Sequence, residues 1–218
     1  MPKRALIDYR PYLLLSLIFG ISYFFVMDGK VGGSFLSLWK GAGVAFLAIY
    51  AAQRGRGREG VLITLVLAFG ALADVVLEFN FLFGGLLFAV GHLIAIWLFM
   101  TQRREQTTAS QKAAGLALLV GTPTLAAMLT YPLENWYLAA LYALVVGAMA
   151  GAAWTSGFPR YRVGIGAVLF VVSDLIIFAR EAGQMPRPIA EWLVWPLYYG
   201  GQFLIATGVI QTIRKGKV

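Results

Sequence analysis

The chain has 218 residues, of which 60% are hydrophobic and only 13% are charged, and its formal net charge is +8. Soluble globular domains carry about 25% charged residues, so this composition excludes an ordinary water-soluble domain. The abundant apolar surface also excludes a disordered chain. Eight membrane-spanning helices of about 20 residues would occupy about 160 residues and leave only short loops. We therefore expect one transmembrane domain over residues 1–218, folded as an all-α polytopic bundle.

Apolar runs bounded by charged or turn residues predict eight membrane-spanning helices. In chain order the expected ranges are 11–27, 35–52, 61–79, 84–101, 113–131, 136–155, 163–180 and 192–213. The third and fourth ranges are separated only by turn signals at Asn80 and Gly84-Gly85, which predicts a very tight helical hairpin.

The first apolar run follows the cations Lys3, Arg4 and Arg10, a pattern that signal peptides share. The end of this run, residues 21–27, is bulky and aromatic, and no small-residue cleavage site follows it. We therefore expect an uncleaved first helix.

The cations are distributed unevenly between the two sides of this eight-helix scheme. Fourteen lie on the side of the termini: Lys3, Arg4, Arg10, Arg54, Arg56, Arg58, Arg103, Arg104, Lys112, Arg160, Arg162, Arg214, Lys215 and Lys217. Four lie on the other side: Lys30, Lys40, Arg180 and Arg187. Cytoplasmic loops are enriched in Lys and Arg, so we expect both termini in the cytoplasm and the protein in the cytoplasmic membrane of a bacterium. Four tryptophans fall near the outer ends, as in an aromatic belt: Trp39, Trp136, Trp192 and Trp195.

Several classes of site are excluded by the residue inventory. The chain has no cysteine, which excludes disulfides, iron–sulfur clusters, thiolate zinc and a cysteine nucleophile. Its single histidine, His92, excludes a multi-histidine metal site within one chain. No phosphate-binding loop, serine-hydrolase elbow or zinc-protease motif is present. We therefore expect no metal and no cofactor. We also expect no nucleic-acid partner, because membrane topology explains the positive charge.

Ionisable groups within a membrane span cost about 2.5–3.5 kcal/mol each on insertion scales, so their presence there indicates a structural or functional role. The polar residues inside the predicted spans are Lys40, Asp74, Glu78, His92, Asp174 and Gln202. In the eight-helix scheme all six fall between the midplane and the outer face. This predicts one polar cavity that opens away from the cytoplasm or laterally into the outer leaflet.

Each of these residues also has a structural interpretation. Glu78 is compatible with a snorkelling side chain at the outer interface. Asp74 and His92 are each compatible with a hydrogen bond that ties helices together. Lys40 is compatible with an interfacial anchor or with a functional cation.

Asp174 has possible partners in Ser173, Tyr198 and Tyr199, which would serve either a structural role or a site. Ser173 is not expected to form a serine-hydrolase triad with Asp174, because adjacent residues on a helix do not face each other. A faint repeat relates residues 91–95 to 201–206 and residues 73–77 to 173–177. It suggests a parallel 4+4 arrangement that would bring the two aspartates to equivalent positions.

The chain resembles the YhhN-like lysoplasmalogenase family of membrane proteins. The resemblance rests on residues 72–77, Phe83, Leu86, Phe88, Gly91-His92-Leu93, residues 142–149, residues 166–174, Tyr198-Tyr199, Gln202 and residues 204–206. Two positions depart from the usual family pattern: Gly41 stands where Pro is usual, and Ala73 stands where Gly is usual.

The resemblance implies hydrolysis of the vinyl ether bond of a single-chain phospholipid, a lysoplasmalogen, to a fatty aldehyde and a glycerophospho-amine. This chemistry needs an acid and an anionic group, and we predict that Asp74 and Asp174 fill these two roles; the sequence does not decide which is the acid and which is the base. Glu78, His92, Ser173, Tyr198, Tyr199 and Gln202 would orient these groups or the substrate, and Lys40 would meet the lipid phosphate.

A second class of function remains open from the residues alone. Acidic residues, a histidine and a faint repeat also suit a proton-coupled transporter or carrier of a lipid-like molecule. Many transporters have helices broken by Gly or Pro at the site. Pro123 and Pro196 are the prolines well inside the predicted spans, and neither adjoins an aspartate. A catalytically inactive relative is a third alternative, and the oligomeric state is left open.

Overall fold

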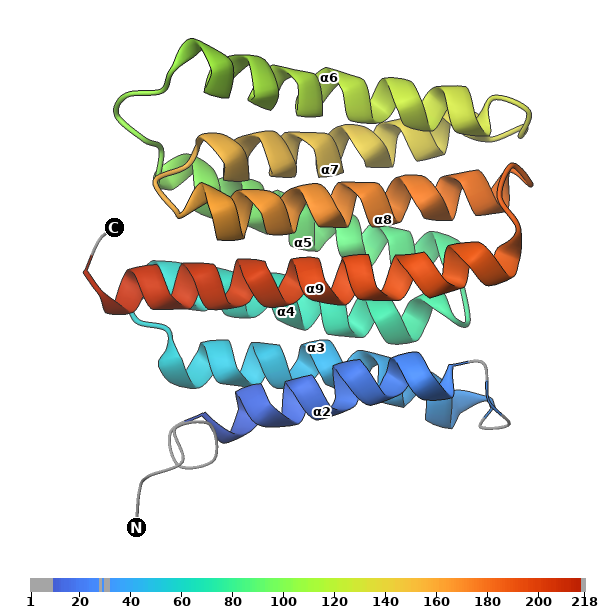
Figure 1. The fold of residues 1–218 in the computed structure, drawn as a ribbon, viewed down its shortest axis with the longest axis horizontal. Coiled ribbons are helices and arrows are strands. Elements are labelled where there is room, and N and C mark those ends of the chain that lie inside the picture. Colours follow the sequence, from blue (N-terminus) through green and yellow to red (C-terminus); the bar gives the residue numbers. More distant parts are fainter. Residues whose placement is uncertain (1–9, 28, 30–31, 217–218) are drawn as a thin grey trace. The chain divides into compact units, whose positions relative to one another are not determined.

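A computed structural model describes residues 10–27, 29 and 32–216 of the chain (Figure 1). The described residues form eight α-helices and one π-helical turn. Their bounds are α2 Pro11–Val26, α3 Ser34–Arg54, α4 Gly57–Leu77, α5 Phe81–Thr101, α6 Ala109–Thr130, α7 Trp136–Thr155, η1 Arg160–Gly164, α8 Ile165–Glu181 and α9 Arg187–Arg214. Each predicted span therefore corresponds to one helix, which confirms the all-α polytopic class.

Among the described residues, seven helices are long and apolar enough to cross a membrane, and α2 is a shorter apolar helix of 16 residues. The protein is therefore an integral membrane protein. The sidedness of the termini and the 4+4 repeat stay predictions. Four of the cations that predicted the orientation of the chain or an uncleaved first helix lie outside the described residues: Lys3, Arg4, Lys30 and Lys217.

The chain divides into two compact units, Met1–Gly91 (unit 1) and His92–Val218 (unit 2). Residues 81–91 of α5 belong to unit 1, and residues 92–101 belong to unit 2. The assignment of residues 1–218 to a single transmembrane domain stays a prediction.

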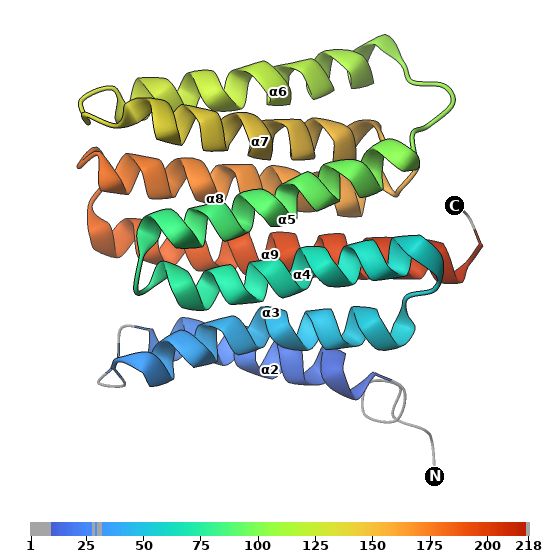
Figure 2. The same cartoon turned by 180° about the vertical axis from the view of Figure 1, so that it is seen from behind.

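In unit 1, α3 packs between α2 and α4 (Figure 2). The approach of α3 to α4 is close at Gly41, where an added Cβ would lie 2.6 Å from Val75 Cγ2 and 3.0 Å from the Ala71 carbonyl oxygen. The predicted hairpin between the third and fourth spans is confirmed. Its turn ends at Asn80, whose Oδ1 accepts a hydrogen bond of 3.0 Å from the backbone N–H of Phe83 in the first turn of α5.

In unit 2, α6 packs on α7, α7 on α8, and α8 on α9 (Figure 1). Small residues at the crossings let the backbones approach closely, as is typical of helices in membranes. A Cβ added to Gly201 of α9 would lie 2.7 Å from the Gly166 carbonyl oxygen of α8. At the α6–α7 crossing, a Cβ added to Gly151 would lie 2.8 Å from the carbonyl oxygen of Gly115.

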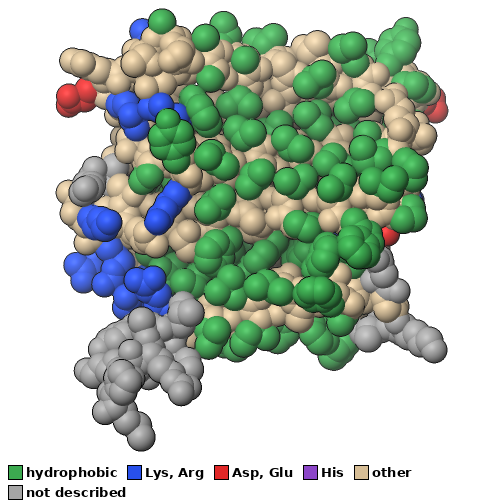
Figure 3. All heavy atoms as spheres, in the orientation of Figure 1, with side chains coloured by type: hydrophobic (Ala, Val, Ile, Leu, Met, Phe, Trp, Pro, Cys, Tyr) green, Lys and Arg blue, Asp and Glu red, His purple; other side chains and the backbone are tan. Residues whose placement is uncertain are grey.

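One end of unit 2 collects the ends of α5, α7 and α9. The backbone N–H of Gly157 donates to the Gln102 carbonyl at 2.6 Å, and Arg162 donates to Gln211. In the face drawn in Figure 3, Lys and Arg side chains gather towards the end where α9 terminates. Hydrophobic side chains cover the length of the helices, as a lipid-facing surface requires. We refer to this end of unit 2 as its cationic end.

Three of the four tryptophans predicted near the outer ends are exposed or half-buried and one is buried, and their position relative to a membrane stays a prediction. Trp136 and Trp192 are exposed and Trp39 is half-buried, as interfacial residues would be. Trp195 is buried instead, and its ring stacks on that of Tyr199 at 5.7 Å and 14°. Positions 195 and 199 are one turn apart on a helix, so both side chains lie on the same buried face of α9.

Candidate functional site

The polar centre of unit 2 is formed by three side chains from three helices. Tyr142 of α7 donates its hydroxyl to Asp174 Oδ2 of α8 at 3.0 Å. The same hydroxyl lies 3.4 Å from Nε2 of His92 on α5. His92 and Asp174 are 4% and 8% exposed, whereas Tyr142 is half-buried. Residues separated by 50 and 32 positions in the chain thus form one hydrogen-bonded group.

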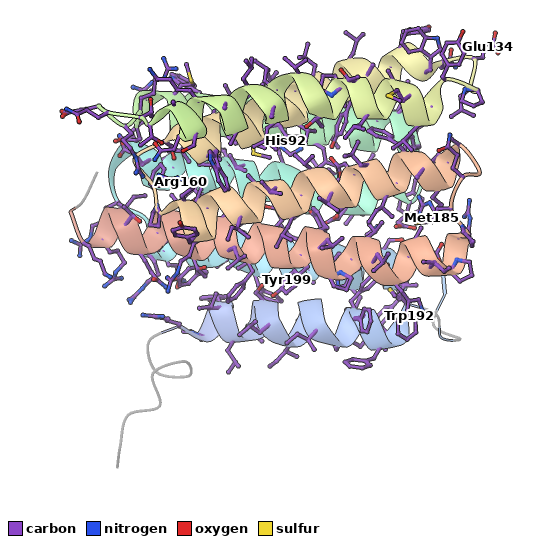
Figure 4. The ribbon with its side chains drawn as sticks, turned by 45° about the horizontal axis from the view of Figure 1, so that its top comes forward. His92, Glu134, Arg160, Met185, Trp192 and Tyr199 are labelled. Atoms are coloured by element: carbon purple, nitrogen blue, oxygen red, sulfur yellow. The ribbon has the colours of Figure 1, made fainter. Side chains whose placement is uncertain are left out.

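This group lies towards the end of unit 2 opposite the cationic end. Tyr142 is six residues after the start of α7 at Trp136, and Asp174 is seven residues before the end of α8 at Glu181. At a rise of 1.5 Å per residue, both lie about 10 Å from that end. Figure 4 shows His92 between Arg160 at the cationic end and Glu134 at the other. The position of this end in the outer half of the membrane stays a prediction.

Aromatic rings hold the two ring-bearing members of the group in place. The His92 ring meets Phe170 edge-on, with centroids 4.7 Å apart and planes at 86°. Tyr142 meets Phe178 edge-on at 6.0 Å and 85°. Edge-to-face contacts of this kind are worth about 0.5–1.5 kcal/mol beyond area burial. Both rings are therefore restrained in orientation, which fixes the direction of their polar atoms.

Ser173 neighbours Asp174 in sequence, but its hydroxyl donates to the Phe170 carbonyl at 2.7 Å, within the helix. A serine hydroxyl that bonds back into its own helix is a common arrangement in membrane spans. The hydroxyl proton of Ser173 is therefore directed at its own helix, and the exclusion of a Ser173 triad stays a prediction.

The remaining predicted residues of unit 2 lie on α9. Tyr198, Tyr199 and Gln202 are all buried, and the Tyr198 ring meets Phe170 edge-on at 5.2 Å. Phe170 therefore contacts both His92 and Tyr198. Tyr198 thus lies on the same aromatic ring as His92 does.

In unit 1, Lys40 of α3 and Glu78 at the end of α4 form an ion pair with Nζ and Oε1 2.5 Å apart. The Lys40 side chain is 16% exposed and that of Glu78 is 42% exposed. Exposed ion pairs contribute only about 0–1 kcal/mol to stability. The pair therefore places a cation and an anion together, with the Glu78 carboxylate the more accessible of the two.

Asp74 lies one turn before Glu78 on α4 and is 1% exposed. Four residues along a helix place two side chains on the same face, about 6 Å apart along the axis. Asp74 is therefore the buried carboxylate of unit 1, and Glu78 is the accessible one.

The structure assigns the predicted residues to two groups. Lys40, Asp74 and Glu78 belong to unit 1, and His92, Ser173, Asp174, Tyr198, Tyr199 and Gln202 belong to unit 2. The pairing of Asp74 with Asp174 stays a prediction.

The residue that the sequence reasoning missed is Tyr142. Its signal was a phenol inside a span, in a stretch that resembles the family.

Comparisons with known proteins agree with the sequence motifs. The family model described as the YhhN family matches residues 35–209. Lysoplasmalogenase TMEM86A of Bos taurus is 29% identical over 162 residues, which are 67% of this chain and 64% of that protein. Lysoplasmalogenase TMEM86B of Sus scrofa is 33% identical over 136 residues, which are 61% of this chain and 55% of that protein. The matches thus span less than two thirds of either relative. No solved structure matches the chain significantly.

Proposed function

Because the chain belongs to the YhhN family, we propose that it is a membrane-embedded hydrolase that cleaves the vinyl ether bond of lysoplasmalogens. The products would be a fatty aldehyde and a glycerophospho-amine. The names of the two relatives support this substrate. The structural observation that carries the proposal is the hydrogen-bonded group of buried Asp174, buried His92 and half-buried Tyr142, because it can hold and move a proton in a largely nonpolar surrounding.

The chemistry needs an acid and an anionic group. An acid protonates the β-carbon of the vinyl ether, which leaves an oxocarbenium ion. Water adds to this ion and loses a proton, and the resulting hemiacetal collapses to the aldehyde and the glycerol hydroxyl. Glycosidases handle oxocarbenium-like transition states with two carboxyl groups in different environments.

We assign the two carboxyl roles to Asp74 and Asp174. Both are buried, which favours direct proton transfer to the lipid over exchange with bulk water. His92, Tyr198 and Gln202 would orient the carboxylates or the attacking water. In this scheme Ser173 supports the helix through its bond to Phe170.

The ion pair of unit 1 suits a zwitterionic head group. Lys40 would meet the phosphate and Glu78 the ammonium, each exchanging its present partner for a lipid charge. Asp74, one turn deeper on α4, would then lie beside the glycerol end of the chain, where the vinyl ether is found. This arrangement explains why a cation and an anion occupy the same accessible position.

We place the enzyme in the cytoplasmic membrane of a bacterium, with its active site towards the outer leaflet. The transporter alternative predicts broken helices at the site. Both α6 and α9 run without interruption through Pro123 and Pro196, so the described helices favour the enzyme.

The proposal is tested by incubating the purified protein in detergent with a lysoplasmalogen and, separately, with its saturated alkyl-ether analogue. We expect fatty aldehyde from the vinyl ether alone. Asp74→Asn and Asp174→Asn should each abolish aldehyde formation while the proteins remain folded by circular dichroism. Absence of aldehyde with folded wild-type protein would refute the hydrolase. Full activity in either variant would refute the two-carboxylate scheme.

A further inference from the structure

We infer that Tyr142 is a positioning residue that carries protons between Asp174 and His92 during turnover. The inference rests on the proposed hydrolase, and it assigns the acid of that reaction to Asp174. Tyr142 does not contact the lipid in this scheme. It acts through Asp174.

The geometry gives the Tyr142 hydroxyl two partners of different kinds. A phenol hydroxyl donates one hydrogen bond and accepts others through its lone pairs. Its proton is directed at Asp174 Oδ2, 3.0 Å away. The lone pairs can therefore accept from His92 Nε2 at 3.4 Å, and for this reason we place the imidazole proton on Nε2. This distance is longer than the usual N–H···O hydrogen bond of about 2.7–3.2 Å, and catalytic hydrogen bonds are often long before substrate binds.

Burial makes such a route useful. Asp174 and His92 are 8% and 4% exposed, so a proton reaches Asp174 more readily along hydrogen bonds than from bulk water. The edge-on contacts of His92 with Phe170 and of Tyr142 with Phe178 restrain the two rings. The hydroxyl is thereby kept between the carboxylate and the imidazole.

The proton balance closes over one turnover. Asp174 gives its proton to the β-carbon of the vinyl ether and becomes a carboxylate. Water then adds to the oxocarbenium ion and releases one proton as the hemiacetal forms. Tyr142 gives its hydroxyl proton to Asp174 and takes the Nε2 proton of His92. His92 takes the released proton at Nδ1 as it gives up its Nε2 proton. The imidazole then loses the Nδ1 proton to water and takes one from water at Nε2, which restores the Nε2–H tautomer with no net change in protons.

The competing interpretation is structural, because the same two bonds tie α5, α7 and α8 together. Tyr142→Phe separates the two interpretations, since it keeps the ring beside Phe178 and removes only the hydroxyl. The matched control is Tyr50→Phe, which makes the same change at a buried position on α3, outside the proposed machinery.

For the relay we expect Tyr142→Phe to lower kcat by about 10- to 100-fold, the factor expected for loss of a hydrogen bond to a charged group. KM should change less than about two-fold, because the lipid contacts are intact. Tyr50→Phe should leave both constants at the wild-type level. Wild-type kcat in Tyr142→Phe, or a loss expressed in KM alone, would overturn the relay.

A second measurement does not depend on activity. His92 is the single histidine of the chain, so ¹⁵N-histidine labelling reports this imidazole without overlap. We expect one protonated nitrogen, Nε2, and one nitrogen without a proton, Nδ1, in the wild-type protein. In Tyr142→Phe the Nε2 signal should shift and its proton should exchange faster with solvent. Identical spectra for wild type and Tyr142→Phe would overturn the inference.

The kinetic measurement and the histidine spectra together distinguish failure of the relay from failure of the proposed function. Wild-type protein that makes no aldehyde would refute the hydrolase, and the histidine spectra would still decide whether the hydrogen-bonded chain exists. Active wild-type protein with unchanged Tyr142→Phe kinetics would refute the relay alone.

Discussion

Lys40 and Glu78 lie 38 residues apart in the chain, and their side chains meet at 2.5 Å between Nζ and Oε1. The contact joins the first part of α3 to the end of α4. A cation paired with an anion at an accessible place matches the charges of a phospho-amine head group.

Charge removal at this pair is expected to change substrate selection. Glu78→Gln should lower kcat/KM for a lysoplasmalogen with a phosphoethanolamine head group by about 5- to 30-fold, equivalent to about 1–2 kcal/mol for a charge-assisted hydrogen bond. It should affect an analogue with a bare phosphate much less, because that analogue has no ammonium for Glu78 to bind. Lys40→Met should lower kcat/KM for both lipids, because both carry the phosphate that Lys40 would bind. Steady-state kinetics with the two lipids measure kcat/KM for the wild-type protein and for each variant.

The control for the pair is Lys112→Met, which removes a cation near the start of α6. Unchanged kinetics are expected. Equal losses with both lipids in Glu78→Gln would contradict ammonium recognition. Thermal unfolding of Lys40→Met should shift little, since exposed pairs contribute about 0–1 kcal/mol.

Two adjacent glycines of α9 should respond oppositely to alanine. A Cβ at Gly201 would lie 2.7 Å from the Gly166 carbonyl oxygen, whereas a Cβ at Gly200 has nothing within 4 Å. Gly201→Ala should therefore destabilise the protein by about 1–3 kcal/mol through overpacking. Gly200→Ala should be neutral or stabilising by up to about 1 kcal/mol, because alanine is the better helix former.

Thermal unfolding in one detergent, followed by circular dichroism, compares the two glycine variants. Equal melting temperatures for the two variants would contradict the close α8–α9 crossing. Gly166→Ala tests the other side of the crossing, where an added Cβ would lie 2.8 Å from the Gly201 carbonyl oxygen.

The absence of native cysteine makes the membrane topology directly measurable. Lys112 and Glu134 are exposed residues near opposite ends of α6. If the positive-inside distribution sets the orientation, a membrane-impermeant thiol reagent added to intact spheroplasts should label Glu134→Cys and not Lys112→Cys. Both should be labelled after the membrane is permeabilised. The reverse pattern would place the termini outside.

Much of the fold follows from local sequence. A span is recognised by hydropathy over about 20 residues, so each of the eight ranges is determined by its own composition. The hairpin at Asn80 is also local, because its cap joins residues three positions apart. Trp195 shows the limit of this reasoning. Its position near a span end predicted an interfacial residue, but the packing of α9 buries it against Tyr199.

The sequence by itself determined the spans, the uneven charge and the inventory of polar groups inside the membrane, since each is a property of a short segment. Only the tertiary structure decided that Tyr142 bonds to Asp174 beside His92, and that Lys40 bonds to Glu78. Such contacts depend on the rotation of each helix about its axis and on close crossings such as that of Gly166 and Gly201. In a span that is apolar on all sides, the sequence pattern hardly specifies that rotation, and packing against neighbouring helices sets it.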